Sequence, residues 1–378
     1  MTGIRAGMVG CGNIGRSLVS SLLRKSNQIE ILSLYDPDPR SVRRALKDIS
    51  STATVCSSLD EMLSGPVEWV LIASWNASHA QQSIAALNAG KHVFCQKPLA
   101  ISFEDCLAVY DVWKSSGKNF VMGFTLRFSP HYRKIKALLA EGSIGQILSL
   151  ELNETLPFYH GGYIMGDWRR LKVNAGTHLL EKCCHDIDVL NWIVGDRVSK
   201  VASFGGNNFF RPENRFHQDR IGVDEKGRRA YEQWPGLIAE NPFTSEKDIV
   251  DNQVCILEFE NQVRASFHLN SNAGLPERRL YICGSEGSLR ADVLTGRIEI
   301  QRIGYEETVR DCSTGEKGLH GGGDEVLSTE LAEAMILGNV PRVGVREGIE
   351  SAIVCFAIDE AMEKGVVVEL DAYWERLS

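Results

Sequence analysis

Strand and helix patterns alternate over the first 125 residues of the chain. Between the strand patterns, apolar residues recur at helical spacing, as in Ile14, Leu18 and Leu22, which predicts helices with one face on a sheet. The strand patterns are continuous apolar runs, typical of parallel strands covered on both faces. They lie at residues 4–9, 30–35, 67–73, 92–95 and 120–124. Residues 1–125 are therefore predicted to form a doubly wound α/β domain.

Shorter strand patterns joined by tight turns follow, and they predict a second domain at residues 126–378. These patterns lie at residues 254–259, 262–269, 280–283, 288–291 and 297–302. Glu260-Asn261, between the first two, predicts a two-residue hairpin. Short connections indicate antiparallel pairing, so this domain is predicted to be α+β. A last helix is expected at about 346–364, ending before Gly365.

A long charged segment without clear periodicity covers residues 207–247. A loop of that length inside a compact domain is usually functional or mobile. We expect it either to edge the substrate site or to reach a neighbouring subunit.

The turn after the first strand pattern reads G-C-G-N-I-G at residues 10–15, the G-x-G-x-x-G of dinucleotide-binding domains. Gly10 permits the tight turn, Gly12 lets the backbone approach a pyrophosphate, and Gly15 lets the following helix pack closely. The free amides at the helix start, around Asn13 and Ile14, then hold the phosphates. A glycine-rich turn without a ligand is the alternative, and the strand before and the helix after argue against it.

Asp36 ends the second strand pattern, 36 − 15 = 21 positions after Gly15, where an acid accepts hydrogen bonds from the adenosine ribose. Its carboxylate would repel a 2′-phosphate, which favours NAD over NADP. Arg40 and Arg43 lie close enough in sequence to weaken that preference, unless they are solvated helix charges. NADP therefore stays open as an alternative cofactor.

Polar and aromatic residues follow the next two strand patterns at the carboxyl edge of the sheet, where such domains bind their cofactor. We expect cofactor contacts from Ser74, Trp75, Asn76, His79, Gln96 and Lys97. Ser78 is predicted to cap the helix that stops at Gly90.

Residues 178–194 predict a helix with two unlike faces when projected at about 100° per residue. One face is apolar, and the other holds His178, Glu181, His185, Asp188 and Trp192. Spacing alone leaves two interpretations open, a functional site and a solvated polar face, although tryptophan and histidine are poor choices for plain exposure. Glu181 and His185 stand at i, i+4 and can share a hydrogen bond. The role of Lys182 is left open.

Composition and charge argue against several classes of function. Lys and Arg total 41 against 49 Asp and Glu, and the net charge of −8 does not favour a nucleic-acid or anionic-membrane partner. No apolar run approaches the roughly 20 residues that span a bilayer. The ten cysteines are scattered apart from Cys183-Cys184, and no spacing matches a zinc site. We therefore expect free thiols, no metal and a cytoplasmic protein.

Residues 90–100 read G-K-H-V-F-C-Q-K-P-L-A and resemble the A-G-K-H-V-x-x-E-K-P-L-A signature of the glucose–fructose oxidoreductase and inositol dehydrogenase family (Gfo/Idh/MocA). Three further segments resemble that family in the same order along the chain, at 123–128, 181–188 and 282–289. The second of these matches the family's D-x-x-x-H helix. The resemblance covers essentially the whole chain.

The resemblance implies a Rossmann domain followed by an α/β domain with a large, open, mostly antiparallel sheet. It implies an NAD(P)-dependent dehydrogenase or reductase of a sugar, sugar derivative or cyclitol, with Lys97, His185 and Glu181 as catalytic residues. His185 would be the general base, Lys97 would stabilise the alkoxide, and Glu181 would orient one of them. The Lys97–Pro98 bond is expected to be cis. Gln96 and Glu181 stand where the family usually has Glu and Asp.

A homodimer or homotetramer is also implied, because an open sheet can cover its free face with another subunit. Polar and aromatic residues together suit a sugar ring, and the candidates for substrate contacts besides Lys97 and His185 are Arg127, Tyr159, Trp168, Arg169, Asn174, His178 and His320. His320 begins a glycine-rich turn, for which capping of the next helix by Asp324 is the alternative.

Two other functions remain open. A redox-neutral, NAD-dependent glycoside cleavage by transient oxidation and elimination would use the same lysine and histidine. A non-enzymatic NAD-binding sensor would be expected to lack Lys97 or His185, and both are present.

Overall fold

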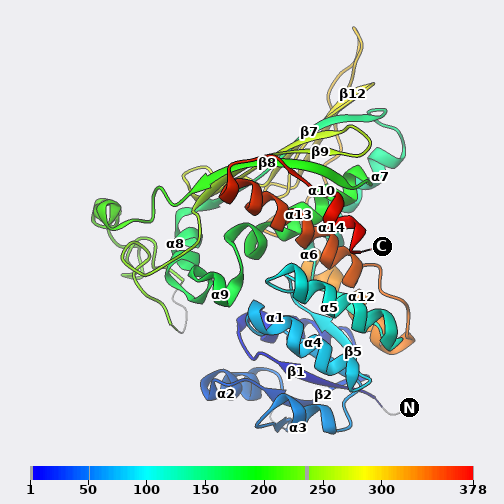
Figure 1. The fold of residues 1–378 in the computed structure, drawn as a ribbon, viewed down its shortest axis with the longest axis vertical. Helices are drawn as coiled ribbons and strands as arrows, with labels where there is room; N and C mark the ends of the chain where they lie inside the picture. The colour runs from blue at the N-terminus through cyan, green and yellow to red at the C-terminus, as the bar shows by residue number, and fades with distance from the viewer. Residues whose placement is uncertain (1–2, 51, 235–237, 378) are drawn as a thin grey trace. The chain divides into compact units, whose positions relative to one another are not determined.

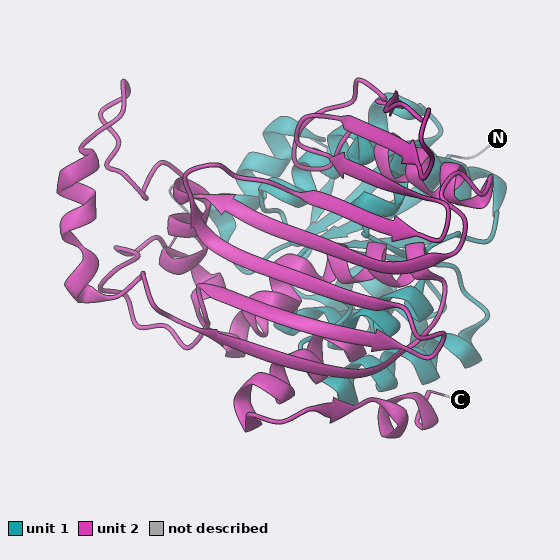
Figure 2. Cartoon of the chain, turned by 90° about the horizontal axis from the view of Figure 1, so that it is seen from above, with its two compact units in different colours: residues 1–129, 322–352 teal, residues 130–321, 353–378 magenta. Residues whose placement is uncertain are grey.

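The computed structural model describes residues 3–50, 52–234 and 238–377. The chain forms two compact units, which Figure 2 colours separately. Unit 1 comprises Met1–Ser129 and Gly322–Ala352, and unit 2 comprises Pro130–Gly321 and Ile353–Ser378. The change of unit after Ser129 lies close to the boundary that we predict after residue 125. The return of Gly322–Ala352 to unit 1 has no counterpart in that linear division.

Unit 1 is built on a six-stranded sheet in the order β3-β2-β1-β4-β5-β6, in which every neighbouring pair is parallel. The strands are β1 (Ile4–Val9), β2 (Ile29–Tyr35), β3 (Thr54–Val55), β4 (Trp69–Ile72), β5 (His92–Cys95) and β6 (Phe120–Met122). Along the chain they alternate with α1 (Asn13–Lys25), α2 (Pro39–Asp48), α3 (Leu59–Ser64), α4 (His79–Asn88) and α5 (Phe103–Ser116) (Figure 1). This confirms the predicted Rossmann sheet, whose strand order reverses between β1 and β4.

Ser78 does not cap α4 with its side chain, contrary to the prediction. A 3-10 turn over Asn76–Ser78 runs directly into the helix, and Ser78 has φ −95° and ψ −12°. A capping side chain needs an extended backbone to reach the first free amides, and Ser78 is already in a helical conformation. The end of the helix before Gly90 is as predicted, and Gly90 has φ +71°.

The returning segment completes unit 1 with α12 (Gly323–Leu337) and the start of α13 (Val345–Lys364). α12 packs on α1 and on α6 (Thr125–Phe128). α12 approaches α6 so closely that a Cβ on Gly323 would lie 2.3 Å from the carbonyl oxygen of Thr125. Capping by Asp324 is the alternative for the turn at His320, but the N-cap of α12 is Gly322 and Asp324 lies within the first turn.

Unit 2 is built on a nine-stranded sheet in the order β14-β13-β12-β11-β7-β10-β9-β8-β15. Its strands are β7 (Ile147–Pro157), β8 (Val198–Gly206), β9 (Asn252–Phe259), β10 (Arg264–Ala273), β11 (Arg279–Gly284), β12 (Gly287–Asp292), β13 (Arg297–Arg302), β14 (Arg310–Asp311) and β15 (Val368–Glu369). β7 and β10 are parallel, and the other neighbours are antiparallel. The predicted large, mostly antiparallel sheet is confirmed.

The turn between β9 and β10 is longer than the predicted two residues. The amide of Phe259 donates to the carbonyl of Val263 at 2.9 Å, so residues 260–262 form a three-residue loop. Gln262 takes the left-handed conformation, with φ +66°. Glu-Asn lacks the glycine that favours a two-residue turn with two positive φ angles, and a type I turn followed by one left-handed residue is the usual three-residue solution.

One face of the unit 2 sheet is apolar, buried and packed against helices, and the other is open. Along β9, Cys255, Leu257 and Phe259 are buried, whereas Val254 and Ile256 are 47% and 61% exposed. Phe204 on β8 pairs with Val254 in the register and is 79% exposed. Figure 2 looks onto this open face, and no helix that the structure describes in unit 2 covers it in that view.

The remaining helices of unit 2 are α7 (Pro130–Ala140), α8 (Phe158–Gly166), α9 (Lys172–Ala175), α10 (Cys184–Val194), α11 (Phe216–Ile221) and α14 (Asp371–Glu375), with short 3-10 turns at Trp168–Arg170 and Pro212–Asn214. α13 ends at Lys364 before Gly365, as predicted. Within the described part of the chain, no helix is both long enough and apolar enough to cross a membrane.

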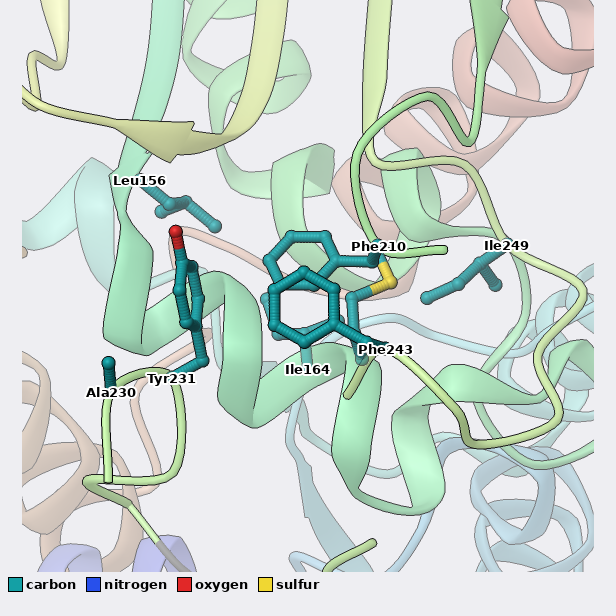
Figure 3. Packing of buried hydrophobic residues seen from close by; sticks show 8 residues of the cluster. Leu156, Ile164, Phe210, Ala230, Tyr231, Phe243 and Ile249 are labelled. Atoms are coloured by element: carbon teal, nitrogen blue, oxygen red, sulfur yellow. The ribbon is translucent and has the colours of Figure 1, made fainter. Parts of the chain in front are cut away.

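The long segment over residues 207–247 is irregular, as predicted, but it has a core of its own. Phe210, Tyr231 and Phe243 pack with Leu156 and Ile164, from β7 and α8, in the cluster of Figure 3. The ring centroids of Tyr231 and Phe243 are 5.1 Å apart. Residues 235–237 of the segment lie outside the described residues. The apolar cluster fixes the segment against α8 despite its charged composition.

Candidate active site

The glycine turn after β1 has the geometry that a dinucleotide requires. Gly10 has φ +86°, and a Cβ there would lie 2.4 Å from the backbone of Ala73 and Ser74. A Cβ on Gly15 would lie 2.5 Å from the carbonyl oxygen of Gly10, so these two glycines allow the turn and the helix packing. Gly12 faces open space, with no atom within 4 Å of a Cβ built there. The amides that start α1, at Asn13 and Ile14, therefore stand beside an uncovered cradle that fits a pyrophosphate.

The Asp36 carboxylate is held beside this turn by two backbone amides. Its Oδ2 accepts from the amide of Cys11 at 2.7 Å, and its Oδ1 accepts from the amide of Asp38 at 2.8 Å. Each oxygen keeps a further lone pair for a ribose hydroxyl. Arg40, which weakens the preference for NAD in the sequence, donates from Nε to Asp38 Oδ1 at 3.0 Å. That ion pair holds Arg40 at the start of its own helix. The negative charge of Asp36 itself would repel a 2′-phosphate, which favours NAD.

The loop after β4 is tied to the chain after β5 by His79. This histidine is 1% exposed, and its Nδ1 and Nε2 lie 2.7 Å and 3.2 Å from the carbonyl oxygens of Pro98 and Ser74. Burial lowers its pKa, against the two carbonyls, which favour the protonated ring. Trp75 is 43% exposed and Asn76 is buried. Of the predicted cofactor residues in this loop, His79 thus has a clear structural role, and Trp75 is the accessible one.

Gln96 and Lys97 lie at the carboxyl end of β5, on the same edge of the unit 1 sheet as the glycine turn. Both are half-buried. The Lys97–Pro98 peptide bond is cis, as predicted. Gly123 approaches closely, because a Cβ there would lie 2.9 Å from Gln96 Oε1. Arg127, also half-buried, lies on α6 in the same unit.

In unit 2 the predicted catalytic helix departs from a regular α-helix at its start. Leu179–Cys183 form a π-helical turn, and α10 begins only at Cys184. The 100° projection is therefore wrong for this first turn, because a π turn holds more residues. Both faces are buried: His178, Glu181, His185 and Asp188 are at most 7% exposed. The interpretation as a solvated polar face is wrong.

Glu181 pairs with Arg169. Arg169 donates from Nε to Glu181 Oε1 at 3.1 Å and from Nη1 to the hydroxyl of Tyr163 at 2.7 Å. Its guanidinium also lies 4.2 Å from the ring centroid of Trp168. This pairing neutralises Arg169 and fixes the carboxylate, whereas the sequence assigns Glu181 to orienting His185 or Lys97.

His185 and His320 lie together in unit 2, with ring centroids 5.6 Å apart and planes inclined by 52°. His185 is 4% exposed and His320 is half-buried. The structure thus brings the expected base and one expected substrate residue side by side. Two imidazoles at this distance can both act on one polar ligand.

Other predicted substrate residues divide into two groups. His178 lies 2.6 Å from the carbonyl oxygen of Val250 through Nδ1 and 3.3 Å from Ser271 Oγ through Nε2, so it holds the local fold. Asn174 donates from Nδ2 to the carbonyl of Trp168 at 3.3 Å. Tyr159 instead stacks edge-on against Trp234, with centroids 5.0 Å apart, and forms part of an aromatic surface.

Sequence reasoning missed two features of this region. Trp234 contacts His160 as well as Tyr159, with its ring centroid 5.0 Å from each, and it comes from the long segment whose contacts no local pattern predicts. Lys182, whose role is open in the sequence, pairs with Glu154 of β7. The only signal in the sequence is that Lys182 stands between Glu181 and His185, and this does not identify the partner of the lysine. Among the described residues, no group of three or more His, Cys, Asp or Glu is arranged to hold a metal ion.

The sheet order, the glycine turn and Asp36 define a dinucleotide-binding Rossmann unit followed by an α/β unit with a large sheet. A family model described as an oxidoreductase family with an NAD-binding Rossmann fold matches residues 4–124, and the model of that family's C-terminal alpha/beta domain matches residues 136–370. The chain therefore belongs to the Gfo/Idh/MocA family of oxidoreductases, as its sequence motifs indicate.

The chain is similar in sequence to several bacterial oxidoreductases and in fold to a solved dehydrogenase. YteT of Bacillus subtilis (strain 168), described as an oxidoreductase, is 25% identical over 91% of this chain and 91% of its own. Inositol 2-dehydrogenase 3 of Saccharopolyspora erythraea is 32% identical over 52% of this chain and 55% of that protein, so this alignment spans about half of each. A levoglucosan dehydrogenase solved with NADH and levoglucosan has a TM-score of 0.79 at 21% identity, over 98% of this chain and 100% of that one. This last likeness shows the fold.

Proposed function

We propose that the protein is an NAD-dependent dehydrogenase that interconverts a hydroxyl and a keto group on a sugar, sugar derivative or cyclitol. The observation that carries this proposal is the buried polar face of residues 178–188, where His185 lies beside His320 and Glu181 is held by Arg169. A buried imidazole beside a half-buried one, in an oxidoreductase with an open dinucleotide cradle, is suited to moving a hydroxyl proton.

The residues of unit 1 would hold the cofactor. The amides after Gly12 would bind the pyrophosphate and Asp36 the adenosine ribose, with NAD favoured over NADP by the Asp36 charge. When bound, the nicotinamide supplies the hydride acceptor of the reaction. Trp75 and Gln96 are the accessible or half-buried residues of the same edge that would contact it.

The residues of this chain would handle the proton and the charge. His185 would accept the hydroxyl proton at an imidazole nitrogen, because a neutral imidazole has one nitrogen free of a proton. Lys97 would donate a hydrogen bond from Nζ to the oxygen that becomes negative. In the direction of reduction, protonated His185 would return the proton to that oxygen, while Lys97 keeps its hydrogen bond to it. Glu181 would keep Arg169 neutralised within the substrate region.

The substrate class is supported by the side chains and by the relatives. Tyr159 and Trp234 offer ring faces, and Arg169 and His320 offer polar groups, a combination that suits the apolar faces and polar edges of a sugar ring. Inositol 2-dehydrogenases of several bacteria are among the relatives. Structural neighbours include a scyllo-inositol dehydrogenase from Lactobacillus casei, solved with NAD(H) and scyllo-inositol, at a TM-score of 0.75 and 22% identity.

Redox-neutral cleavage by transient oxidation is a second candidate. It is favoured by one relative, the 2,7-anhydro-N-acetylneuraminate hydratase of Escherichia coli (strain K12), which is 28% identical over 77% of this chain and 68% of that protein. The same base and lysine would serve, and the hydride would return to the product.

The distinguishing experiment follows absorbance at 340 nm with NAD and a panel of cyclitols, free sugars and glycosides, with the products analysed in parallel. Net NADH formation with a cyclitol or free sugar supports the dehydrogenase. Release of an aglycone without net NADH supports the redox-neutral reaction. Neither signal, in a protein that binds NAD, overturns both candidates and favours a sensor.

We also propose a homodimer or homotetramer built on the open sheet face, because Phe204, Val254 and Ile256 expose an apolar surface there. A cytoplasmic location is supported by the ten free thiols, of which eight are buried.

A further inference from the structure

Arg278, which directly precedes β11, is a fully buried cation, and each nitrogen of its guanidinium makes a polar contact. Nε and Nη2 donate to the two oxygens of Asp186, each at 2.7 Å. Nη2 also lies 2.6 Å from Glu154 Oε2, and Nη1 donates to the carbonyl oxygen of Leu319 at 2.9 Å. The side chain is 1% exposed. Only the planar fork of an arginine makes this set of contacts at once.

A second cation completes the cluster. Lys182 Nζ lies 2.8 Å from Glu154 Oε1, and the side chains of Lys182 and Glu154 are 10% and 2% exposed. The chain of contacts therefore runs Lys182–Glu154–Arg278–Asp186, with two positive and two negative groups when all are ionised. Lys182 and Asp186 lie on either side of His185 in the sequence. The ion pairs of the cluster therefore hold the start of the helix that carries the expected base.

Stability alone is a weak reason for such a cluster. Buried ion pairs lose about as much in desolvation as they gain in attraction, and apolar replacements of whole clusters are often neutral or stabilising. What this cluster does supply is geometry. Through Arg278, three segments far apart in the chain meet at one group: α10 through Asp186, β7 through Glu154, and the turn before His320 through Leu319.

The two carboxylates depend on Arg278 to coexist. Burial raises the pKa of Asp186 to about 7, an effect that Glu154 adds to and Arg278 opposes. Burial also works against the ionised form of Glu154, but Arg278 and Lys182 outweigh it and hold the pKa of Glu154 well below its usual range. Loss of the guanidinium would leave two buried carboxylates in one place, and the start of α10 would have to rearrange.

We infer that Arg278 is a positioning residue that fixes His185 and His320 relative to each other. It holds Asp186, the neighbour of His185, and the carbonyl of Leu319, the neighbour of His320. The inference rests on the proposed function for the meaning of that placement. Arg278 does not touch the reacting groups. Its contribution is to keep the two imidazoles in a geometry in which both face one substrate.

The direct test is Arg278→Lys, with Arg279→Lys as a matched control. Arg279 is the next residue and is 39% exposed, with Nη1 2.8 Å from Glu151 Oε1 on the sheet surface. Lysine keeps the charge at 278 but cannot bind Asp186, Glu154 and Leu319 together. We expect kcat for the substrate found by the panel to fall roughly 10- to 100-fold in Arg278→Lys, with the Kd for NAD unchanged. Arg279→Lys should match the wild type.

Two further measurements separate positioning from mere folding. Methylguanidinium added to Arg278→Ala should raise kcat severalfold, because it refills the fork, and should leave Arg279→Ala unaffected. In spectra of 13C-labelled histidine, the resonances of His185 and His320, identified with His185→Gln and His320→Gln, should shift in Arg278→Lys and not in Arg279→Lys. The spectra need no substrate, so they test the inference even if the proposed activity fails. Unshifted resonances, or wild-type kcat in a folded Arg278→Lys enzyme, would overturn it.

Discussion

Gly10 and Gly12 are two positions apart, yet the structure constrains them for different reasons. Gly10 needs its positive φ, and its missing Cβ makes room for the backbone of Ala73. Gly12 needs neither, since a Cβ there meets no atom within 4 Å beyond its own neighbours in the chain. A side chain at Gly10 would disturb the fold, and one at Gly12 would occupy the space where the cofactor approaches.

Gly12→Ala should therefore separate cofactor binding from stability. We expect an unchanged free energy of unfolding, within about 0.5 kcal/mol, and a Kd for NAD at least about tenfold weaker, which corresponds to roughly 1.4 kcal/mol. Gly10→Ala is the contrasting variant and should lose roughly 1–3 kcal/mol of stability, because it combines a positive φ with a backbone clash. Urea unfolding and fluorescence titration with NAD measure the two effects. Wild-type NAD affinity in Gly12→Ala would refute the cradle.

Residues whose role depends on local backbone were predictable, and residues whose role depends on distant partners were not. The glycine turn and the place of Asp36 beside it follow from neighbours in the sequence, and the structure has both. The cis bond between Lys97 and Pro98 is implied by the family resemblance, and the structure has it too. The partners of Glu181 and Asp186 are Arg169 and Arg278, the second 92 positions away. Because an ion pair has no sequence period, only the folded chain reveals it.

At the scale of elements, the expected catalytic helix shows where periodicity misleads. Its apolar positions are spaced as in an α-helix, but the first turn is π-helical and every residue from 178 to 190 is buried. Polar residues that would mark a solvated face elsewhere are held here by ion pairs and carbonyls. The three-residue loop after β9 is a similar case, in which the strands were predicted correctly and the backbone of one turn residue changed the connection.

A buried histidine that is kept neutral in the folded protein makes the free energy of unfolding depend on pH. His131, at the start of α7, is 1% exposed, and burial lowers its pKa to about 4. The unfolded chain takes up this proton near pH 6.5, above the folded value, so stability falls as the pH drops from about 6.5 towards 4. For this single group the loss is about 2 kcal/mol at pH 5 relative to neutral pH.

His131→Gln should remove that loss. The difference in unfolding free energy between pH 7.5 and pH 5, measured with urea, should be smaller in the variant than in the wild type by about 2 kcal/mol. Comparing the two proteins cancels the contributions of the carboxylates and of the other histidines. An equal pH dependence in both proteins would show that His131 is not held neutral in the folded state.

At the scale of the whole molecule, the class of fold was predictable from the sequence. The assignment of the segment Gly322–Ala352 to the first unit was not. Alternating strands and helices, followed by strands with short turns, correctly predicted a doubly wound parallel sheet and a second, mostly antiparallel sheet. The large size of the second sheet is implied by the family resemblance. The segment Gly322–Ala352 joins the first unit because α12 packs on α1 and α6. That packing is a contact between distant parts of the chain, and a division drawn along the sequence cannot represent it.

The open sheet face gives a prediction about assembly. Ile256→Glu places a charge on the apolar surface next to Val254 and should shift the mass measured by light scattering after size exclusion towards the monomer. Leu275→Glu is the control, because Leu275 is 87% exposed but lies in the loop after β10. It should keep the wild-type mass. A monomeric wild type, or an unchanged mass in Ile256→Glu, would contradict assembly through this face.

A single-turnover experiment tests most directly whether Lys97 and His185 carry the chemistry of an NAD-dependent oxidation. Enzyme saturated with NAD is mixed with the substrate found by the panel, and absorbance at 340 nm is followed for the wild type, Lys97→Met and His185→Asn. We predict that the rate of hydride transfer falls by roughly 100- to 10,000-fold in each variant, while the Kd for NAD stays at the wild-type value. Wild-type rates in either variant would contradict the assignment of that residue to the reaction.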